Sequence, residues 1–258
     1  MKEILIVGCS IAQGYGLTYE SQDPELWGNL LINDVWGSAK ITNLSEPGRN
    51  NHWIFTEAAN AIRSKKYHAV IVSWSYLARL NVNVGLELYS TRTMLNDGAV
   101  NINVNPNNTY SKEWLIKTGD RLRTIQNDHW AILDLVKYVN ILLSLKQNNL
   151  FFVNTLFPWS QDYFRPKQFL LPSDMSKYQQ DILQAKTRDD SEVLSLYNMI
   201  HQHYQQYGGI SESHWLNLYT SLRSMQVDDV AIDDTHPGYR SQQIFANYLS
   251  PVLKEKLK

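Results

Sequence analysis

The chain has 258 residues, of which 43% are hydrophobic and 19% are charged, and its formal net charge at pH 7 is −1. This composition excludes an intrinsically disordered protein, and the small net charge provides no basic surface for a nucleic acid or an anionic membrane. The single cysteine excludes an internal disulfide. We therefore predict one soluble globular domain that spans residues 1–258.

The first predicted element is a buried strand at residues 4–7, Ile-Leu-Ile-Val. It is followed at 8–16 by Gly-Cys-Ser-Ile-Ala-Gln-Gly-Tyr-Gly, which is typical of a tight turn. A lipoprotein cleavage site before Cys9 is excluded, because a signal peptide needs about 7–15 apolar residues and only four precede Gly8. No other segment reaches the about 18 apolar residues of a membrane span. We expect a cytoplasmic protein without a signal peptide or a transmembrane segment.

Helices and strands alternate along the next part of the chain. Apolar residues recur at helical spacing over 25–35, residues 40–44 predict a short strand, and residues 51–64 predict a helix with an asparagine cap. Residues 67–75 are a run of apolar residues typical of a buried parallel strand. This order predicts an α/β protein with a three-layer α/β/α architecture and a doubly wound, mainly parallel sheet. Its functional site is expected beyond the carboxyl ends of the strands.

The second half of the chain is less regular. Residues 81–120 are rich in asparagine and turn formers and predict a loop insertion above the sheet. Residues 130–145 predict a helix, 149–157 a fourth strand, and 160–222 mostly helix. Pro237 is suited to the first turn of a final helix.

The turn after the first strand does not have the residues of a phosphate-binding loop. Tyr15 and Gly16 follow Gly14 where such a loop requires Lys and Ser or Thr. Ser10 instead stands just beyond the end of the first strand, where a short turn places its hydroxyl at the edge of the sheet. Ser10 is therefore a candidate nucleophile.

A serine nucleophile needs a base, and the base usually needs a carboxylate that orients it. Asp233 precedes His236 by three residues near the end of the chain, so a single turn can bring the carboxylate and the imidazole together. In an open sheet whose loops gather at one edge, Ser10 and this pair can converge despite their separation in sequence.

These residues resemble the motifs of the SGNH or GDSL-type hydrolases. Gly8-Cys9-Ser10 is similar to the first family motif, Gly-Asp-Ser, and Asp233 to Pro237 match the last, Asp-x-x-His-Pro. The turn that ends at Gly48 is similar to the second motif. The opening also resembles a subgroup that begins Gly-Cys-Ser. The resemblance spans the whole chain and implies the flavodoxin-like fold of that family.

The resemblance also implies a role for each matched residue. Ser10 is the nucleophile, His236 the general base, and Asp233 the residue that orients the histidine. The backbone N–H groups of Ser10 and Gly48 are donors to an oxyanion. No cofactor and no metal ion are required.

The third family motif, Gly-x-Asn-Asp, is altered here. Ser75 stands at the Asn position, where it can offer an oxyanion only a hydroxyl on a shorter side chain. Loss of one oxyanion donor typically lowers turnover by about 10²–10³-fold. Arg79 follows the same strand, and it either binds substrate or pairs with a structural acid.

Other candidate residues have structural interpretations. Cys9 is adjacent to Ser10 and is expected to pack inward as a small hydrophobic residue. Asp228 and Asp229 read as a loop pair without a role. The histidines at 201 and 203 lie two residues apart, which on a helix places them on different faces and argues against a metal site.

The residues and the resemblance together predict a serine ester hydrolase that removes a small acyl group, such as acetyl, from a carbohydrate. Two alternatives use the same fold: a glycan O-acyltransferase with the same triad, and a non-catalytic carbohydrate-binding or assembly module. The expected partner is a small-molecule or glycan ester, with no nucleic acid and no membrane, and the oligomeric state is left open.

Overall fold

The central element of the computed structural model is a parallel sheet of four strands, in the order β2-β1-β3-β7. The strands are β1 (Lys2–Val7), β2 (Ala39–Asn43), β3 (Ala69–Trp74) and β7 (Leu150–Asn154). The structure describes residues 1–75, 80–84, 87–93, 100–102, 128–155, 212–217, 220–227, 229–233 and 236–258. This strand order confirms the predicted doubly wound, parallel sheet.

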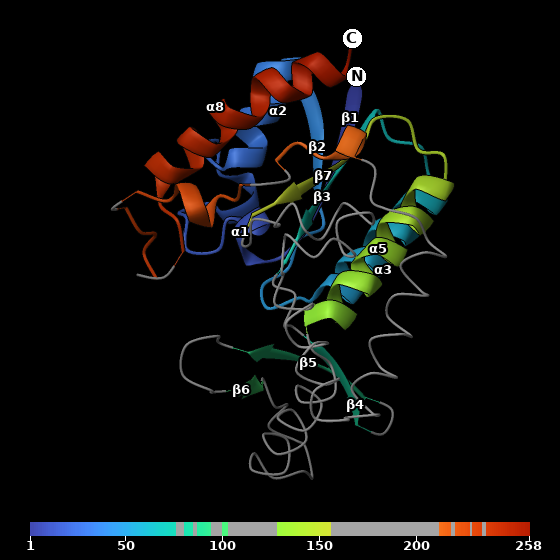
Figure 1. Cartoon of the computed structure of the whole chain (residues 1–258). Coiled ribbons are helices and arrows are strands. Elements are labelled where there is room, and N and C mark those ends of the chain that lie inside the picture. Colours follow the sequence, from blue (N-terminus) through green and yellow to red (C-terminus); the bar gives the residue numbers. More distant parts are fainter. Residues whose placement is uncertain are drawn as a thin grey trace, which may run out of the picture.

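Helices cover both faces of this sheet (Figure 1). On one face, α2 (Trp27–Trp36) packs against α8 (Tyr239–Lys256), and on the other face α3 (Asn51–Ser64) packs against α5 (Asp128–Ser144). The predicted three-layer α/β/α architecture is therefore confirmed. Within the described ranges, no helix combines the length and the hydrophobicity that a membrane span requires.

The two inner strands are continuous apolar runs because helices bury both of their faces. In β1, residues 4–7 are fully buried, and every residue of β3 is buried. Ile6 of β1 lies beside Ile71 of β3 in parallel register. The carboxyl ends of β1 and β3 therefore meet at one edge, and the turns that follow them lie close together.

Local hydrogen bonds define where two of the helices begin. The side chain of Asn50 accepts a hydrogen bond from the backbone N–H of Trp53 at 2.9 Å, so Asn50 is the cap of α3. The carboxylate of Asp229 accepts from the backbone N–H of Ser241, in the first turn of α8, at 3.1 Å. The sequence-based interpretation of Asp229 as a residue without a role is therefore wrong.

The prediction that Pro237 lies in the first turn of the final helix is also wrong. α8 begins at Tyr239, with Gly238 as its cap residue. Pro237 instead forms an isolated bridge with Val230. This bridge closes the loop before α8, so the helix begins two residues later than the sequence suggested.

A second sheet lies where the sequence predicted a loop insertion. β4 (Leu80–Val84), β5 (Glu87–Thr93) and β6 (Val100–Ile102) form an antiparallel sheet in the order β4-β5-β6. For these residues the prediction of a loop is wrong. The strand signal was present in the alternation Leu-Asn-Val-Asn-Val at 80–84, which has the period of two of a strand. Residues 160–222, which the sequence predicts to be mostly helical, lie largely outside the described residues.

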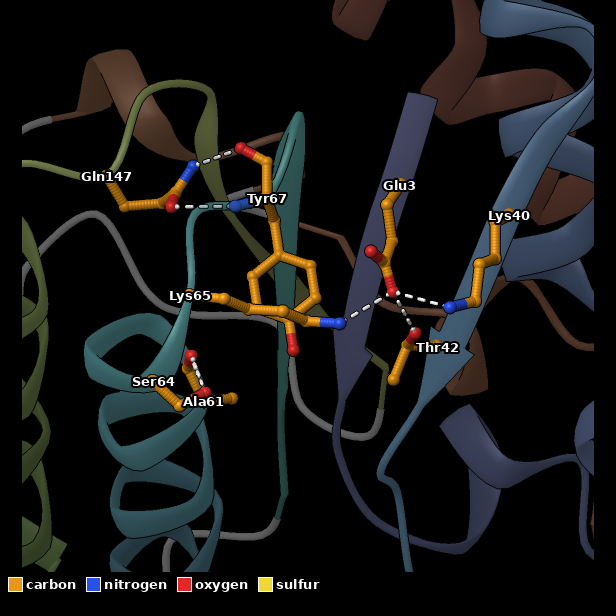
Figure 2. Close-up of polar contacts among 8 residues, drawn as sticks. All are labelled: Glu3, Lys40, Thr42, Ala61, Ser64, Lys65, Tyr67 and Gln147. Atoms are coloured by element: carbon orange, nitrogen blue, oxygen red, sulfur yellow. Dashed lines mark hydrogen bonds and ion pairs between the residues drawn. The ribbon is translucent and has the colours of Figure 1, made fainter. Parts of the chain in front are cut away.

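At the amino edge of the main sheet, Glu3 connects three elements (Figure 2). Its carboxylate accepts from the ammonium of Lys65 at 2.7 Å, and it lies 3.2 Å from the ammonium of Lys40. The hydroxyl of Thr42 donates to the same oxygen at 3.0 Å. These donors, Lys65 first, lower the pKa of Glu3 to about 2. Glu3 thereby joins β1 to β2 and to the end of α3.

Candidate active site

The first component of the site is the turn at the carboxyl end of β1. Cys9 has an extended backbone and caps the short helix α1 (Ser10–Gln13), so Ser10 is the first helical residue. The side chain of Cys9 is fully buried in the hydrophobic core, as the sequence predicted. Ser10 is thus placed at the sheet edge with its backbone N–H in the first turn, where N–H groups lack helical acceptors.

Two glycines of this turn permit close approaches that a side chain would block. A Cβ at Gly8 would lie 2.6 Å from the Cβ of Ala12 and 2.9 Å from the Cβ of Ser73. A Cβ at Gly16 would lie 2.9 Å from Oδ1 of Asp233, and the φ of +85° at Gly16 is one that other residues rarely adopt. Gly8 therefore lets the turn pack against β3, and Gly16 lets it pack against the acid of the site.

Ser10, His236 and Asp233 form a continuous hydrogen-bonded chain. Oγ of Ser10 lies 2.9 Å from Nε2 of His236, and Nδ1 of His236 lies 2.5 Å from Oδ2 of Asp233. The backbone N–H of His236 also donates to Oδ1 of Asp233 at 3.1 Å. The structure thus brings together the three residues that the sequence singled out, although Ser10 and His236 are 226 positions apart.

The chemistry of these atoms determines where the protons lie. An ionised carboxylate can only accept hydrogen bonds, so Nδ1 of His236 carries the proton that faces Asp233. In neutral imidazole, Nε2 then has a lone pair, and the hydroxyl of Ser10 donates to it. This is the arrangement in which a histidine can remove the proton from a serine hydroxyl.

The loop that carries Asp233 and His236 is attached both to itself and to the turn of Ser10. The backbone N–H of Ala231 donates to the carbonyl of His236 at 2.8 Å. The backbone N–H of Ile232 donates to the carbonyl of Gly16 at 3.1 Å. These two bonds fix the segment of Asp233 and His236 relative to the turn that carries Ser10.

Tyr239, in the first turn of α8, provides another connection that sequence reasoning missed. Its hydroxyl donates to the carboxylate of Asp23 at 2.9 Å and accepts from the backbone N–H of Thr18 at 3.1 Å. Asp23 is only 2% exposed. Tyr239 lies three residues after His236, so this contact joins the histidine segment to the segment that follows α1.

The loop between β2 and α3 contains Gly48, and hydrogen bonds connect this loop to the turn that carries Ser10. The side chain of Asn43 donates to the carbonyl of Ala12 at 2.8 Å and accepts from the backbone N–H of Ser45 at 3.0 Å. The backbone N–H of Glu46 donates to the carbonyl of Gly8 at 3.2 Å. The role of Gly48 as an oxyanion donor stays a prediction, and these bonds fix the loop on which it depends.

Ser75, at the position of the altered third motif, is held by an asparagine. Its backbone N–H donates to Oδ1 of Asn51 at 2.7 Å, and its carbonyl accepts from Nδ2 of Asn51 at 3.3 Å. The backbone N–H of Ser75 is therefore occupied, and the role of its hydroxyl as an oxyanion donor stays a prediction. Arg79 lies outside the described residues.

Tyr15 makes the second contact that the sequence did not reveal, and its partner is His236. Its ring meets the imidazole of His236 edge-on, with 5.4 Å between ring centroids and 60° between ring planes. The signal available in the sequence was its place between Gly14 and Gly16, in the turn that carries the nucleophile. In the part of the chain that the structure describes, no group of three His, Cys, Asp or Glu residues is placed to hold a metal ion.

The fold and the hydrogen-bonded residues define a class of protein: a three-layer α/β/α domain with a Ser-His-Asp arrangement at the carboxyl edge of its parallel sheet. No protein-family model and no curated protein sequence matches the chain.

Among solved structures, the chain is similar to TesA, with 12% identity, 99% of each chain covered and a TM-score of 0.47. It is also similar to the lipase/acylhydrolase from Enterococcus faecalis, with 11% identity, 99% of this chain and 96% of that chain covered, and a TM-score of 0.45. A third similar structure is a carbohydrate acetylesterase family member from Sinorhizobium meliloti, with 12% identity, 100% and 99% coverage, and a TM-score of 0.43.

Proposed function

We propose that the protein is a serine ester hydrolase that acts through an acyl-enzyme. The observation that carries this proposal is the continuous chain of hydrogen bonds from Ser10 through His236 to Asp233. A buried serine hydroxyl that donates to an oriented histidine has the geometry of an activated nucleophile. The position of these residues at the carboxyl edge of a parallel sheet further supports a site of chemistry.

Acylation begins when Oγ of Ser10 attacks the ester carbonyl while Nε2 of His236 takes the hydroxyl proton. The carbonyl π electrons move to the oxygen, which becomes a tetrahedral oxyanion. As the oxyanion collapses, the bond to the alcohol breaks and His236 gives its proton to the departing oxygen. Asp233 stabilises the imidazolium that exists between these two transfers.

Deacylation repeats these steps with water as the nucleophile. His236 removes a proton from water, the hydroxide attacks the acyl carbonyl, and the proton returns to Oγ of Ser10 as the carboxylic acid leaves. The backbone N–H groups of Ser10 and Gly48 are the proposed oxyanion donors in both halves, with the hydroxyl of Ser75 as a third. Each such donor contributes about 3–4 kcal/mol to transition-state stabilisation.

The substrate we propose is a carbohydrate that carries a small acyl group such as acetyl. The motifs that resemble the SGNH hydrolases support the ester chemistry. The proposal of a carbohydrate rests on the same resemblance and on the tyrosine beside His236.

The test compares hydrolysis of p-nitrophenyl acetate and of an acetylated methyl glycoside by the wild type and His236→Ala. We expect turnover of both esters in the wild type and loss of turnover in the variant. Adding glycerol as an acceptor separates hydrolysis from acyl transfer, because a transferase would form glyceryl acetate instead of acetate. Binding of the glycoside without turnover of either ester by the wild type would contradict the proposal.

A further inference from the structure

Besides its two hydrogen bonds, the imidazole of His236 has an aromatic contact. Asp233 accepts from Nδ1, and the hydroxyl of Ser10 donates to Nε2. The ring of Tyr15 meets the imidazole edge-on, with 5.4 Å between ring centroids. Edge-to-face aromatic pairs at this distance attract each other and have a preferred orientation. The contact with Tyr15 therefore restrains the imidazole in addition to its hydrogen bonds.

The position of Tyr15 follows from the way in which α1 ends. Gly14 has a left-handed φ of +81°, and its N–H donates to the carbonyl of Ile11 at 3.3 Å. The N–H of Tyr15 donates to the carbonyl of Ser10 at 2.9 Å. These two bonds form a Schellman motif, which attaches the residue after the glycine to the helix that it follows. Because α1 is so short, that attachment is to its first residue, Ser10.

The residue after Tyr15 connects the same turn to the segment of His236. The carbonyl of Gly16 accepts from the N–H of Ile232 at 3.1 Å. Both this bond and the bond from Tyr15 to Ser10 use backbone atoms, so they persist when the side chain of Tyr15 is shortened. That side chain is 41% exposed and lies outside the hydrophobic core. Its ring can therefore be removed without removing the bonds that shape the turn.

Ester hydrolysis changes the contacts of His236 between its two halves. Before acylation, the hydroxyl of Ser10 donates to Nε2. In the acyl-enzyme, Oγ of Ser10 is esterified and carries no proton, so it cannot donate this hydrogen bond. Nε2 then has to take a proton from water. The bond to Asp233 and the ring contact with Tyr15 involve no reacting atom and persist in this intermediate.

We propose that Tyr15 is a positioning residue that keeps His236 oriented in the acyl-enzyme, so that Nε2 can activate water. This inference rests on the proposed ester hydrolysis. The χ2 torsion of histidine has a broad range, and a hydrogen bond at Nδ1 restrains the tilt of the ring only loosely. The ring of Tyr15 restrains that tilt when the bond to Ser10 is gone. Tyr15 therefore matters more for deacylation than for acylation.

The experiment separates the two half-reactions with p-nitrophenyl acetate. The value of kcat/KM reports acylation, and rapid quench followed by intact-mass measurement gives the rate at which the acetylated enzyme disappears. We expect Tyr15→Ala to slow deacylation by about 5–10-fold and to lower kcat/KM by less than about 2-fold. Tyr15→Phe keeps the ring and should match the wild type in both. Tyr248→Ala is the matched control, because Tyr248 is a tyrosine of similar exposure, 39%, within α8.

Three results would overturn the inference while the ester hydrolase itself stands. Equal effects of Tyr15→Ala on the two half-reactions would show a general structural role. Unchanged or faster deacylation would show that the ring does not orient the base. Slow deacylation in Tyr15→Phe would assign the effect to the hydroxyl instead of the ring. A wild type that forms no acetylated enzyme and releases no p-nitrophenol would instead contradict the proposed function, and this inference with it.

Discussion

At the scale of single residues, the carboxylate of Asp233 determines which nitrogen of His236 holds the proton. It accepts from both Nδ1 and the backbone N–H of His236, so it orients the ring and fixes the tautomer in one contact. Nε2 is left with its lone pair toward Ser10. The proposed nucleophile, Ser10, therefore depends on a residue that it does not touch.

Replacing Asp233 with Asn should remove this control of the tautomer. The amide can donate to Nδ1 of His236, which favours the tautomer with the proton on Nε2. In that tautomer Nε2 cannot accept the hydrogen bond from Ser10. We expect Asp233→Asn to lower the turnover of p-nitrophenyl acetate by about 10³–10⁴-fold with little change in unfolding temperature. A variant that retains more than about a tenth of wild-type turnover would contradict this role.

Gly16 combines a positive φ with a close approach to Asp233, and the two effects can be separated. Gly37 also has a positive φ, +65°, but no described atom lies within 4 Å of where its Cβ would be. Both Gly16→Ala and Gly37→Ala should lose stability through strain, by at least about 1–2 kcal/mol. We expect Gly16→Ala alone to lower turnover, by about 10–100-fold, because its Cβ displaces the acid. Equal turnover in the two variants, measured with p-nitrophenyl acetate, would argue against this.

At the scale of elements, the start of α8 sets the position of the histidine. The helix begins three residues after His236, and Asp229 stabilises its first turn from across the loop by accepting from the backbone N–H and the hydroxyl of Ser241. The loop between these two contacts holds both Asp233 and His236. The contact that stabilises the first turn of α8 and the proposed catalytic pair thus belong to the same short segment.

Removing the carboxylate of Asp229 should destabilise this segment. We expect Asp229→Ala to lose about 1–2 kcal/mol and to lower the unfolding temperature by about 2–8 °C. Asp229→Asn is the matched control, because its amide oxygen can still accept from Ser241. Calorimetry of the three proteins checks the expected order: wild type, then Asn, then Ala. An unchanged unfolding temperature in Asp229→Ala would show that α8 does not need this contact.

The sequence predicted elements whose signals are local. α3 occupies the predicted residues 51–64, because its cap and its apolar spacing are both written in consecutive residues. Residues 80–84 were misread because two turn-forming asparagines alternate with the apolar residues of a strand. The start of α8 was misplaced because Pro237 pairs with Val230 before the helix begins, a contact that no local pattern reveals.

The same distinction applies to the candidate site. Ser10, Asp233 and His236 could be predicted because short motifs surround each of them. The contacts of Tyr15 with His236 and of Tyr239 with Asp23 join distant segments, so no local pattern reveals them. Asn51 likewise meets Ser75 only because the turns after β2 and β3 gather at one edge of the sheet.

At the scale of the whole molecule, the two edges of the main sheet differ in what their residues do. The carboxyl edge carries Ser10, whereas at the amino edge Glu3 connects β1 to β2 and to the end of α3 through Lys40 and Lys65 (Figure 2). Because Glu3 lies at the start of β1 and Ser10 follows its end, the stability of the amino edge and the chemistry of the carboxyl edge can be varied separately.

The lowered pKa of Glu3 gives the stability a specific dependence on pH. Since the pKa falls from 4.5 to about 2 on folding, its ion pairs stabilise the protein above pH 4.5, and this contribution is lost as the pH falls toward 2. We expect Glu3→Gln to unfold at lower urea than the wild type at pH 7, and the difference to vanish near pH 2. A difference that is constant with pH would contradict the ion pairs as its cause. Turnover at pH 7 should be unchanged.

The central claim, that Ser10 is an activated nucleophile, is tested most directly by its reaction with a fluorophosphonate. Intact-mass measurement on the wild type, Ser10→Ala and Cys9→Ala should show a single adduct in the wild type and in Cys9→Ala, and none in Ser10→Ala. An adduct that persists in Ser10→Ala, or a wild type that forms none, would contradict it.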